Sequence, residues 1–218
     1  MLVFNDLTTH KNQTLNSYSM KILALSDVHG DRTFIKEMAE KAVKEKVDLV
    51  ILAGDLAGND GNLDGMVGPF KEKGLEVGII NGNHEGQADV NFLADRYGVK
   101  NLHGYVWKKG DVGIFGCGYG DIGIHQLPDE EFFNVLKKAH TALGTVKKKI
   151  MVTHVQPNDS VLGLKIPGWG SKGVRKALED FKPDVHICGH IHETHGMEEI
   201  IGKTKVINVG KTGRIIEI

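Results

Sequence analysis

The sequence contains five apolar runs of strand length, and each run stops at an aspartate, an asparagine or a histidine. Short apolar runs of this kind are typical of strands that are buried on both faces in a parallel sheet. Apolar residues at helical spacing follow the first run, in residues 31–45, and the third, in residues 88–97. Strands that alternate with helices in this way predict an α/β fold with a largely parallel sheet and crossover helices.

The first run shows how the end of a strand can carry chemistry. Residues 21–25 lead into Ser26-Asp27-Val28-His29-Gly30. In an extended chain, side chains two residues apart point to the same side, so Asp27 and His29 can converge just past the strand. Ligands of open α/β sheets bind at this edge, which makes the pair a plausible half of a metal site. A helix-capping aspartate and a polar loop histidine would explain the pair as well. We expect this strand to be central in its sheet.

Four further strand ends carry residues of the same types. Asp55 follows residues 47–53, and Asn83 and His84 follow residues 75–80. His154 follows residues 150–153, and His190 and His192 follow residues 184–188. Because the carboxyl ends of parallel strands meet at one edge, the repetition favours a single metal-binding site over five unrelated polar loops.

The remaining segments predict the rest of the fold. Residues 99–108 and 112–116 look like strands joined by a turn, and residues 117–126 form a glycine-rich loop. Residues 128–143 and 171–181 are expected to be helices. The loop 155–170 between them is long enough to favour a functional role. Residues 195–218 alternate like antiparallel strands, with turns near Gly202 and Gly210.

Composition excludes several classes of protein. A length of 218 residues suits one α/β domain, and a net charge of −1 gives no support to nucleic-acid binding. No apolar run has the length of a transmembrane helix, so no membrane association is expected. Two cysteines form no disulfide framework, which predicts a reducing, cytoplasmic location. Composition leaves open whether the chain forms a homo-oligomer.

The first residues differ from the rest. Residues 5–19 are rich in polar side chains and lack periodicity, so we interpret residues 1–19 as a leader and residues 20–218 as a single domain. The leader is either an unstructured extension upstream of a natural start at Met20 or an arm that packs on the body or on a partner.

The order and spacing of the five strand ends resemble the calcineurin-like metallophosphoesterase family. The motifs that carry this resemblance are Asp27-x-His29, Gly54-Asp55, Gly82-Asn83-His84-Glu85, Thr153-His154 and Gly189-His190-x-His192. It extends from about Lys21 to the C-terminus. It implies a four-layer α-β-β-α sandwich, in which two mixed sheets are flanked by helices.

The resemblance also implies two divalent metal ions. It assigns Asp27, His29 and His192 to one ion, and Asn83, His154 and His190 to the other, with Asp55 bridging the two. A bridging carboxylate can hold two ions about 3.5–4 Å apart. Imidazole, carboxylate and amide ligands suit Mn, Fe, Zn, Co or Ni and do not select among them.

The activity implied by the family is hydrolysis of a phosphoester by a hydroxide that bridges the two ions. His84 is the family's general acid, which protonates the leaving oxygen. A loop histidine bonded to Glu85 is the alternative interpretation of this residue. A non-catalytic scaffold with the same fold is disfavoured, because all seven ligand positions and His84 are present.

The substrate is less constrained. Protein phosphatases of the superfamily extend the second motif as Gly-Asp-x-x-Asp-Arg, whereas this chain reads Gly-Asp-Leu-Ala-Gly-Asn from Gly54. The pattern favours a small phosphodiesterase, acting on a small or cyclic-nucleotide-like diester. A phosphomonoesterase of small substrates is the alternative, and a nuclease is disfavoured by the neutral charge.

Loop residues are the expected substrate contacts. His125 lies on the glycine-rich loop with Asp121, and Trp169 on the long loop could stack a base. A packed loop is the alternative interpretation for Trp169. The remaining histidines have no partner motif and are expected in the core or on the surface, with His195 the least secure because it follows His192 by three residues.

Overall fold

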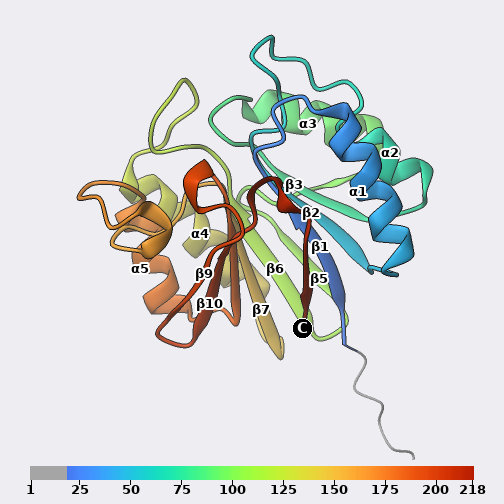
Figure 1. The fold of residues 1–218 in the computed structure, drawn as a ribbon. Helices are drawn as coiled ribbons and strands as arrows, with labels where there is room; N and C mark the ends of the chain where they lie inside the picture. The colour runs from blue at the N-terminus through green and yellow to red at the C-terminus, as the bar shows by residue number, and fades with distance from the viewer. Residues whose placement is uncertain (1–18) are drawn as a thin grey trace, which may run out of the picture.

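The computed structural model describes residues 19–218, so residues 1–18 of the 1–19 leader, on which both of its interpretations depend, lie outside the described residues. Two mixed β-sheets pack face to face, and helices cover their outer faces (Figure 1). The predicted four-layer α-β-β-α sandwich is therefore confirmed. Within residues 19–218, no helix is both long enough and apolar enough to cross a membrane.

The first sheet has five strands in the order β11-β1-β2-β3-β4. Strands β1 to β4 are parallel, and β11 is antiparallel to β1. The predicted central position of the first strand is wrong, because β2 lies in the middle and β1 beside it. The bounds of the strands are β1 Lys21–Leu25, β2 Leu49–Ala53, β3 Val77–Ile80, β4 Lys100–Asn101 and β11 Arg214–Glu217.

The second sheet has six strands in the order β5-β6-β7-β8-β10-β9. Strands β6, β7, β8 and β10 are parallel, and the edge strands β5 and β9 are antiparallel to their neighbours. The bounds are β5 Val106–Lys109, β6 Val112–Cys117, β7 Lys148–Thr153, β8 Val185–Cys188, β9 Glu198–Ile201 and β10 Thr204–Asn208.

Helices cover the outer face of each sheet. The first sheet carries α1 (Arg32–Lys44), α2 (Gly68–Glu72) and α3 (Gln87–Tyr97), and the second carries α4 (Asp129–Leu143) and α5 (Lys172–Phe181). Three short 3₁₀ turns complete the elements of residues 19–218: η1 Val161–Gly163, η2 His192–Thr194 and η3 Gly210–Thr212. Asp31 caps the N-terminus of α1, because its side chain accepts a hydrogen bond from the Phe34 N–H at 2.9 Å.

Successive side chains of each strand point to opposite faces of its sheet, and this arrangement produces three apolar layers. In β1, Ile22 and Ala24 face the other sheet, whereas Leu23 and Leu25 face the helices. In β7, Ile150 likewise faces the first sheet. Because both faces of each central strand are covered, the strands read as continuous apolar runs rather than alternating ones. The layers hold the carboxyl ends of the parallel strands at a common edge.

One predicted strand is in fact two. Residues 99–108 do not form a single element, because β4 pairs with β3 in the first sheet and β5 pairs with β6 in the second. The chain turns between them at Gly104, whose φ of 73° lies in the left-handed region that glycine tolerates. Leu102, which follows β4, and Trp107 of β5 both pack into the core between the sheets.

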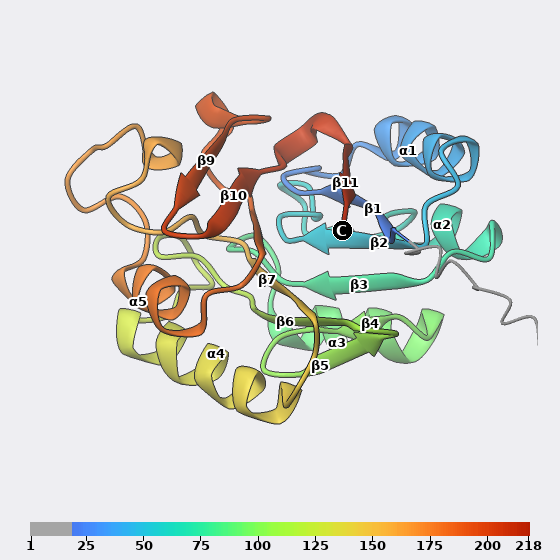
Figure 2. The ribbon, with the colours of Figure 1, turned by 90° about the horizontal axis from the view of Figure 1, so that it is seen from below.

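The C-terminal segment also divides between the sheets. The predicted turn near Gly202 is confirmed, because β9 and β10 are antiparallel neighbours. However, β10 pairs in parallel with β8, and β11 crosses to the first sheet beside β1, as Figure 2 shows. The crossing passes through η3, where the Ser26 N–H donates to the Gly210 carbonyl at 3.0 Å. The last residues of the chain therefore tie the two sheets together beside the end of β1.

Candidate metal centre

The predicted ligand residues converge from both sheets. Strands β1, β2 and β3 of the first sheet and β7 and β8 of the second all end at this point. Three groups of side chains offer ligand atoms that lie within 4.8 Å of one another; the groups are Asp55-His154-His190, His29-Asp55-His84 and Asp27-His192-His195. Five strand ends thus form one continuous cluster of carboxylates and imidazoles.

The backbone is strained at four residues of the cluster that follow β1, β2 and β8. Asp27, His29, Asp55 and His190 have φ angles of 54°, 48°, 52° and 74°. A left-handed conformation costs a residue with a Cβ about 1–3 kcal/mol and persists where neighbours enforce it. Here the Asp27 N–H donates to Gly54 O at 3.1 Å, and the His29 N–H donates to Asp55 O at 3.0 Å. The ends of β1 and β2 therefore hold each other in the conformation that turns their side chains toward the cluster.

Two motif glycines allow the strand ends to approach one another. A Cβ on Gly82 would lie 2.0 Å from Asp55 Oδ1, and a Cβ on Gly189 would lie 2.4 Å from Asp27 Oδ2. Neither distance is possible for a real Cβ, so only glycine fits at these positions. The glycines of these two motifs therefore make room for the carboxylates.

His154 and Asp55 form the most buried part of the cluster. His154 Nε2 lies 3.2 Å from Asp55 Oδ2 and 3.1 Å from Asn83 Oδ1, and its Nδ1 lies 2.9 Å from the Ala53 carbonyl. The carbonyl can only accept, so Nδ1 carries a proton and Nε2 is the atom turned to Asp55 and Asn83. This tautomer leaves the inner nitrogen free to bind a cation.

The pKa shifts of this pair show that the cluster stabilises positive charge. Burial lowers the pKa of His154, but the Asp55 carboxylate outweighs burial and raises it well above its ordinary value. Burial raises the pKa of Asp55, but the charge and hydrogen bond of His154 outweigh burial and lower it. The raised pKa of His154 means that Nε2 binds a proton readily when it faces Asp55. A metal ion can take the place of this Nε2 proton, because ligands lose their protons when a metal binds.

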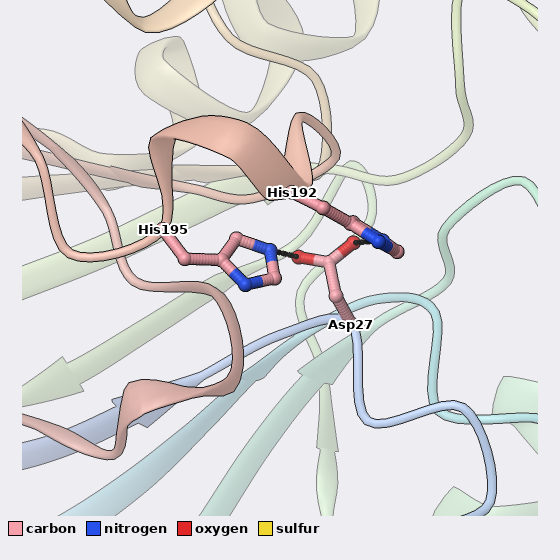
Figure 3. Close-up of side chains that lie close together, drawn as sticks. All are labelled: Asp27, His192 and His195. Atoms are coloured by element: carbon pink, nitrogen blue, oxygen red, sulfur yellow. Dashed lines mark ion pairs between the residues drawn. The ribbon is translucent and has the colours of Figure 1, made fainter.

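Asp27 is the buried carboxylate at the other end of the cluster. Both of its oxygens face the His190 N–H, at 3.2 and 3.1 Å, and the two imidazoles of Figure 3 approach it from opposite sides. Burial raises the pKa of Asp27, but hydrogen bonds from His192 and His195 outweigh burial and lower it. Within residues 19–218, the ion pairs of Asp27 and Asp55 are with histidines alone. Two buried carboxylates without Lys or Arg partners fit a site for divalent cations.

His29 and His84 form the accessible side of the cluster. His29 Nε2 lies 3.2 Å from His192 Nε2, and the His84 ring lies edge-on to His29 with centroids 4.6 Å apart. His84 Nε2 is 3.9 Å from Asp55 Oδ2, and a third of its side chain is exposed. His84 therefore borders the carboxylates and still reaches solvent.

Glu85 is turned away from His84 and into the protein. Its Oε2 accepts from the Leu56 and Ala57 N–H groups at 3.1 and 3.2 Å, and its Oε1 accepts from the Gly82 N–H at 2.9 Å. The interpretation of His84 as a loop histidine bonded to Glu85 is not supported by these contacts. Burial, together with the Asp55 charge, raises the pKa of Glu85 to about 7. Glu85 braces the loop after Asp55 against the loop that carries Asn83.

The two predicted substrate contacts lie at different distances from the cluster. His125 is adjacent to it, because its N–H faces the Asn83 carbonyl at 3.4 Å. Trp169 is 40 % exposed, and its described backbone bonds are to Ile166 and Asn158 of its own loop. The structure does not bring Trp169 into contact with the predicted ligands.

Two residues outside the predicted ligand set also border the cluster. Asp121 Oδ1 lies 3.0 Å from His190 Nε2, and its Oδ2 accepts from the Gly170 N–H at 3.1 Å. His195 Nε2 lies 3.4 Å from Asp27 Oδ2. Asp121 lies on the glycine-rich loop and belongs to none of the five ligand motifs, so no signal in the sequence indicated that it contacts His190. The three-residue spacing of His192 and His195, which sets both on one turn, was the available signal for His195.

Comparison with known proteins identifies the arrangement. The family model described as calcineurin-like phosphoesterase matches residues 20–194. The chain belongs to this family. Proteins of the calcineurin-like phosphoesterase family bind divalent metals, and the donor set of this chain fits such ions.

Solved structures share the fold of this calcineurin-like phosphoesterase. The protein TT1561 of Thermus thermophilus superimposes with a TM-score of 0.73 at 15% identity, covering 92% of this chain and 99% of that one. A dimetal phosphatase from Danio rerio gives 0.60 at 13% identity, with 89% and 88% covered. A structure described as a novel archaeal phosphodiesterase gives 0.53 at 18% identity, with 91% and 99% covered. These similarities establish the fold and leave the substrate to be inferred from the site.

Proposed function

We propose that the protein is a dinuclear metal-dependent phosphoesterase that acts on small phosphodiesters. The observation that carries the proposal is the convergence of the strand ends of two sheets on two buried aspartates whose described ion pairs are all with histidines. Asp27, His29 and His192 would hold one ion and Asn83, His154 and His190 the other, with Asp55 shared. Mn, Fe, Zn, Co and Ni all suit these donors.

Bound ions of this kind lower the pKa of a coordinated water and neutralise phosphate oxygens. The protein supplies the remaining chemistry. We assign to His84 the donation of a proton to the leaving oxygen, and the assignment is supported by its part-exposed ring, which borders Asp55. The Asp55 Oδ1 accepts from the His84 backbone N–H at 3.0 Å, which fixes the direction of the His84 side chain relative to the carboxylate. Glu85 keeps both loops in place without touching the substrate.

The preference for a diester is supported by a cavity beside the cluster. It has a volume of about 480 Å³ and lies between the glycine-rich loop and the end of the long loop, with Asp121, Gln126 and Gly170 on its walls. Asp121 also contacts His190, so one wall of the cavity borders a residue that is assigned to the second ion. A phosphodiester has a second ester group that such a cavity can hold, whereas a phosphomonoester would leave it empty. Trp169 and His125 lie on the loops that border it.

The test compares two chromogenic substrates. The protein is stripped of metal, and Mn, Fe, Co, Ni and Zn are restored one at a time before bis-p-nitrophenyl phosphate and p-nitrophenyl phosphate are assayed. We expect diester hydrolysis to exceed monoester hydrolysis with at least one metal, and Asp55→Asn to abolish both. Faster monoester hydrolysis would assign a phosphomonoesterase instead. Inactivity toward both substrates with every metal would favour a non-catalytic scaffold.

A further inference from the structure

His195 shares a turn with a predicted metal ligand. Its backbone N–H donates to the His192 carbonyl at 3.2 Å, at the C-terminal end of η2. The turn presents both imidazoles to one carboxylate, and Figure 3 shows them reaching different oxygens of Asp27. His192 Nε2 lies 3.6 Å from Asp27 Oδ1, and His195 Nε2 lies 3.4 Å from Asp27 Oδ2.

The second nitrogen of His195 fixes its tautomer. The Lys211 backbone N–H donates to His195 Nδ1 at 3.4 Å. A ring nitrogen that accepts a hydrogen bond carries no proton, so the neutral imidazole has its proton on Nε2. Nε2 is screened from solvent and has no hydrogen-bond partner among residues 19–218, and the acceptor that it faces is Asp27 Oδ2, at 3.4 Å.

The packing around the ring holds it in this orientation. A Cβ on Gly210 would lie 2.1 Å from both Cγ and Cδ2 of His195, so the ring lies directly against the backbone of η3. Gly210 also accepts from the Ser26 N–H at 3.0 Å, one residue before Asp27. The chain crossing between the two sheets therefore brings His195 and Asp27 together.

We propose that His195 is a positioning residue of the metal centre. It donates its Nε2–H to Asp27 Oδ2 and so leaves Asp27 Oδ1 turned toward the first ion, which Asp27 would bind together with His29 and His192. The inference rests on the proposed function, because it assigns Asp27 to a metal. Outer partners of this kind orient a ligating group, and their loss typically weakens metal binding about 10–100-fold.

Two variants of matched shape test the hydrogen bond. The amide nitrogen of Gln can reach the place of the imidazole Nε2, whereas the amide of Asn reaches only the place of Nδ1. In calorimetric titrations of metal-free protein with Mn²⁺ and with Zn²⁺, we expect His195→Asn to lose about 10–100-fold in affinity. His195→Gln should retain affinity within a few-fold. The control His140→Asn, on α4 away from the centre, should match the wild type.

The tautomer provides a test that needs no metal. Long-range ¹H–¹⁵N NMR spectra of the metal-free wild type should show His195 protonated at Nε2. A proton on Nδ1, or a His195→Asn variant with wild-type metal affinity, would overturn the proposal. If the wild type bound neither Mn²⁺ nor Zn²⁺, the proposed function would be wrong, while the NMR spectrum would still decide whether His195 donates to Asp27.

Discussion

Removal of a proton donor lowers turnover but leaves the metal content unchanged, whereas removal of a metal ligand lowers both, and His84 is the residue on which this difference can be tested. Its side chain borders Asp55 without belonging to the predicted ligand set. We expect His84→Ala to keep its metal content, measured by mass spectrometry, and to lose about 10²–10⁴-fold in turnover of an alkyl phosphodiester. The loss should be smaller for bis-p-nitrophenyl phosphate, because its leaving group needs no proton. Equal losses on both substrates would contradict the role of proton donor.

Glu85 stabilises the loops of the site and takes no part in the proposed reaction. Its two oxygens accept from three backbone N–H groups, and the single oxygen of a Gln side chain cannot serve both sides. We expect Glu85→Gln to lower the free energy of unfolding by about 1–3 kcal/mol, the cost of an unsatisfied buried group. Urea unfolding of the metal-free protein measures this loss. The exposed Glu37→Gln on α1 is the matched control and should change stability little.

Glu85 also predicts a pH dependence. Its pKa is about 7 in the folded protein and 4.5 in the reference state, so the folded protein holds the proton more tightly. Between these values the unfolded chain binds fewer protons, and the free energy of unfolding falls as pH rises from 4.5 to 7. Metal-free Glu85→Gln should show a weaker decline across this interval than the wild type. An unchanged decline would show that other groups cause it.

At the scale of elements, the strand ends depend on glycines that have no room for a side chain. A Cβ on Gly189 would lie 2.2 Å from Ser26 Oγ and 2.4 Å from Asp27 Oδ2, so the end of β8 rests directly on the end of β1. We expect Gly189→Ala to lower stability by about 1–3 kcal/mol by overpacking and to weaken metal binding because Asp27 must move. Thermal unfolding and metal titration measure the two effects. Gly68→Ala should be neutral or slightly stabilising, since its nearest side-chain atom is 3.8 Å from the added Cβ.

The elements also show what the sequence could and could not predict. Buried parallel strands followed by polar residues were recognisable, because both faces of each strand are apolar and its end is not. The division of residues 99–108 between two sheets was not recognisable, because Leu102 and Trp107 contribute to the same core although the strands beside them pair in different sheets. The pairing of β11 with β1 depends on a crossing that local alternation cannot reveal. His195 reaches Asp27 because that crossing places Lys211 and Gly210 behind its ring, so its position follows from tertiary structure.

At the scale of the whole molecule, the proposed metals join the two sheets. Asp27, Asp55 and Asn83 come from the ends of β1, β2 and β3, whereas His154 and His190 follow β7 and β8. Without ions, the apolar layer between the sheets and the crossing through η3 still hold them together. The fold should therefore persist when metal is removed, at lower stability.

Metal removal provides the measurement of this coupling. A ligand that binds the folded state at 100 times its Kd stabilises it by about 2.7 kcal/mol, which is about 5–10 °C in Tm for a domain of this size. We expect a chelator to lower the Tm of the metal-loaded wild type by about this amount and to leave the Tm of Asp55→Asn unchanged. Asn83→Ala and His190→Ala, which remove one ligand from each sheet, should reduce the chelator effect to a similar extent. A reduction by only one of these two variants would show that the ion is held by a single sheet.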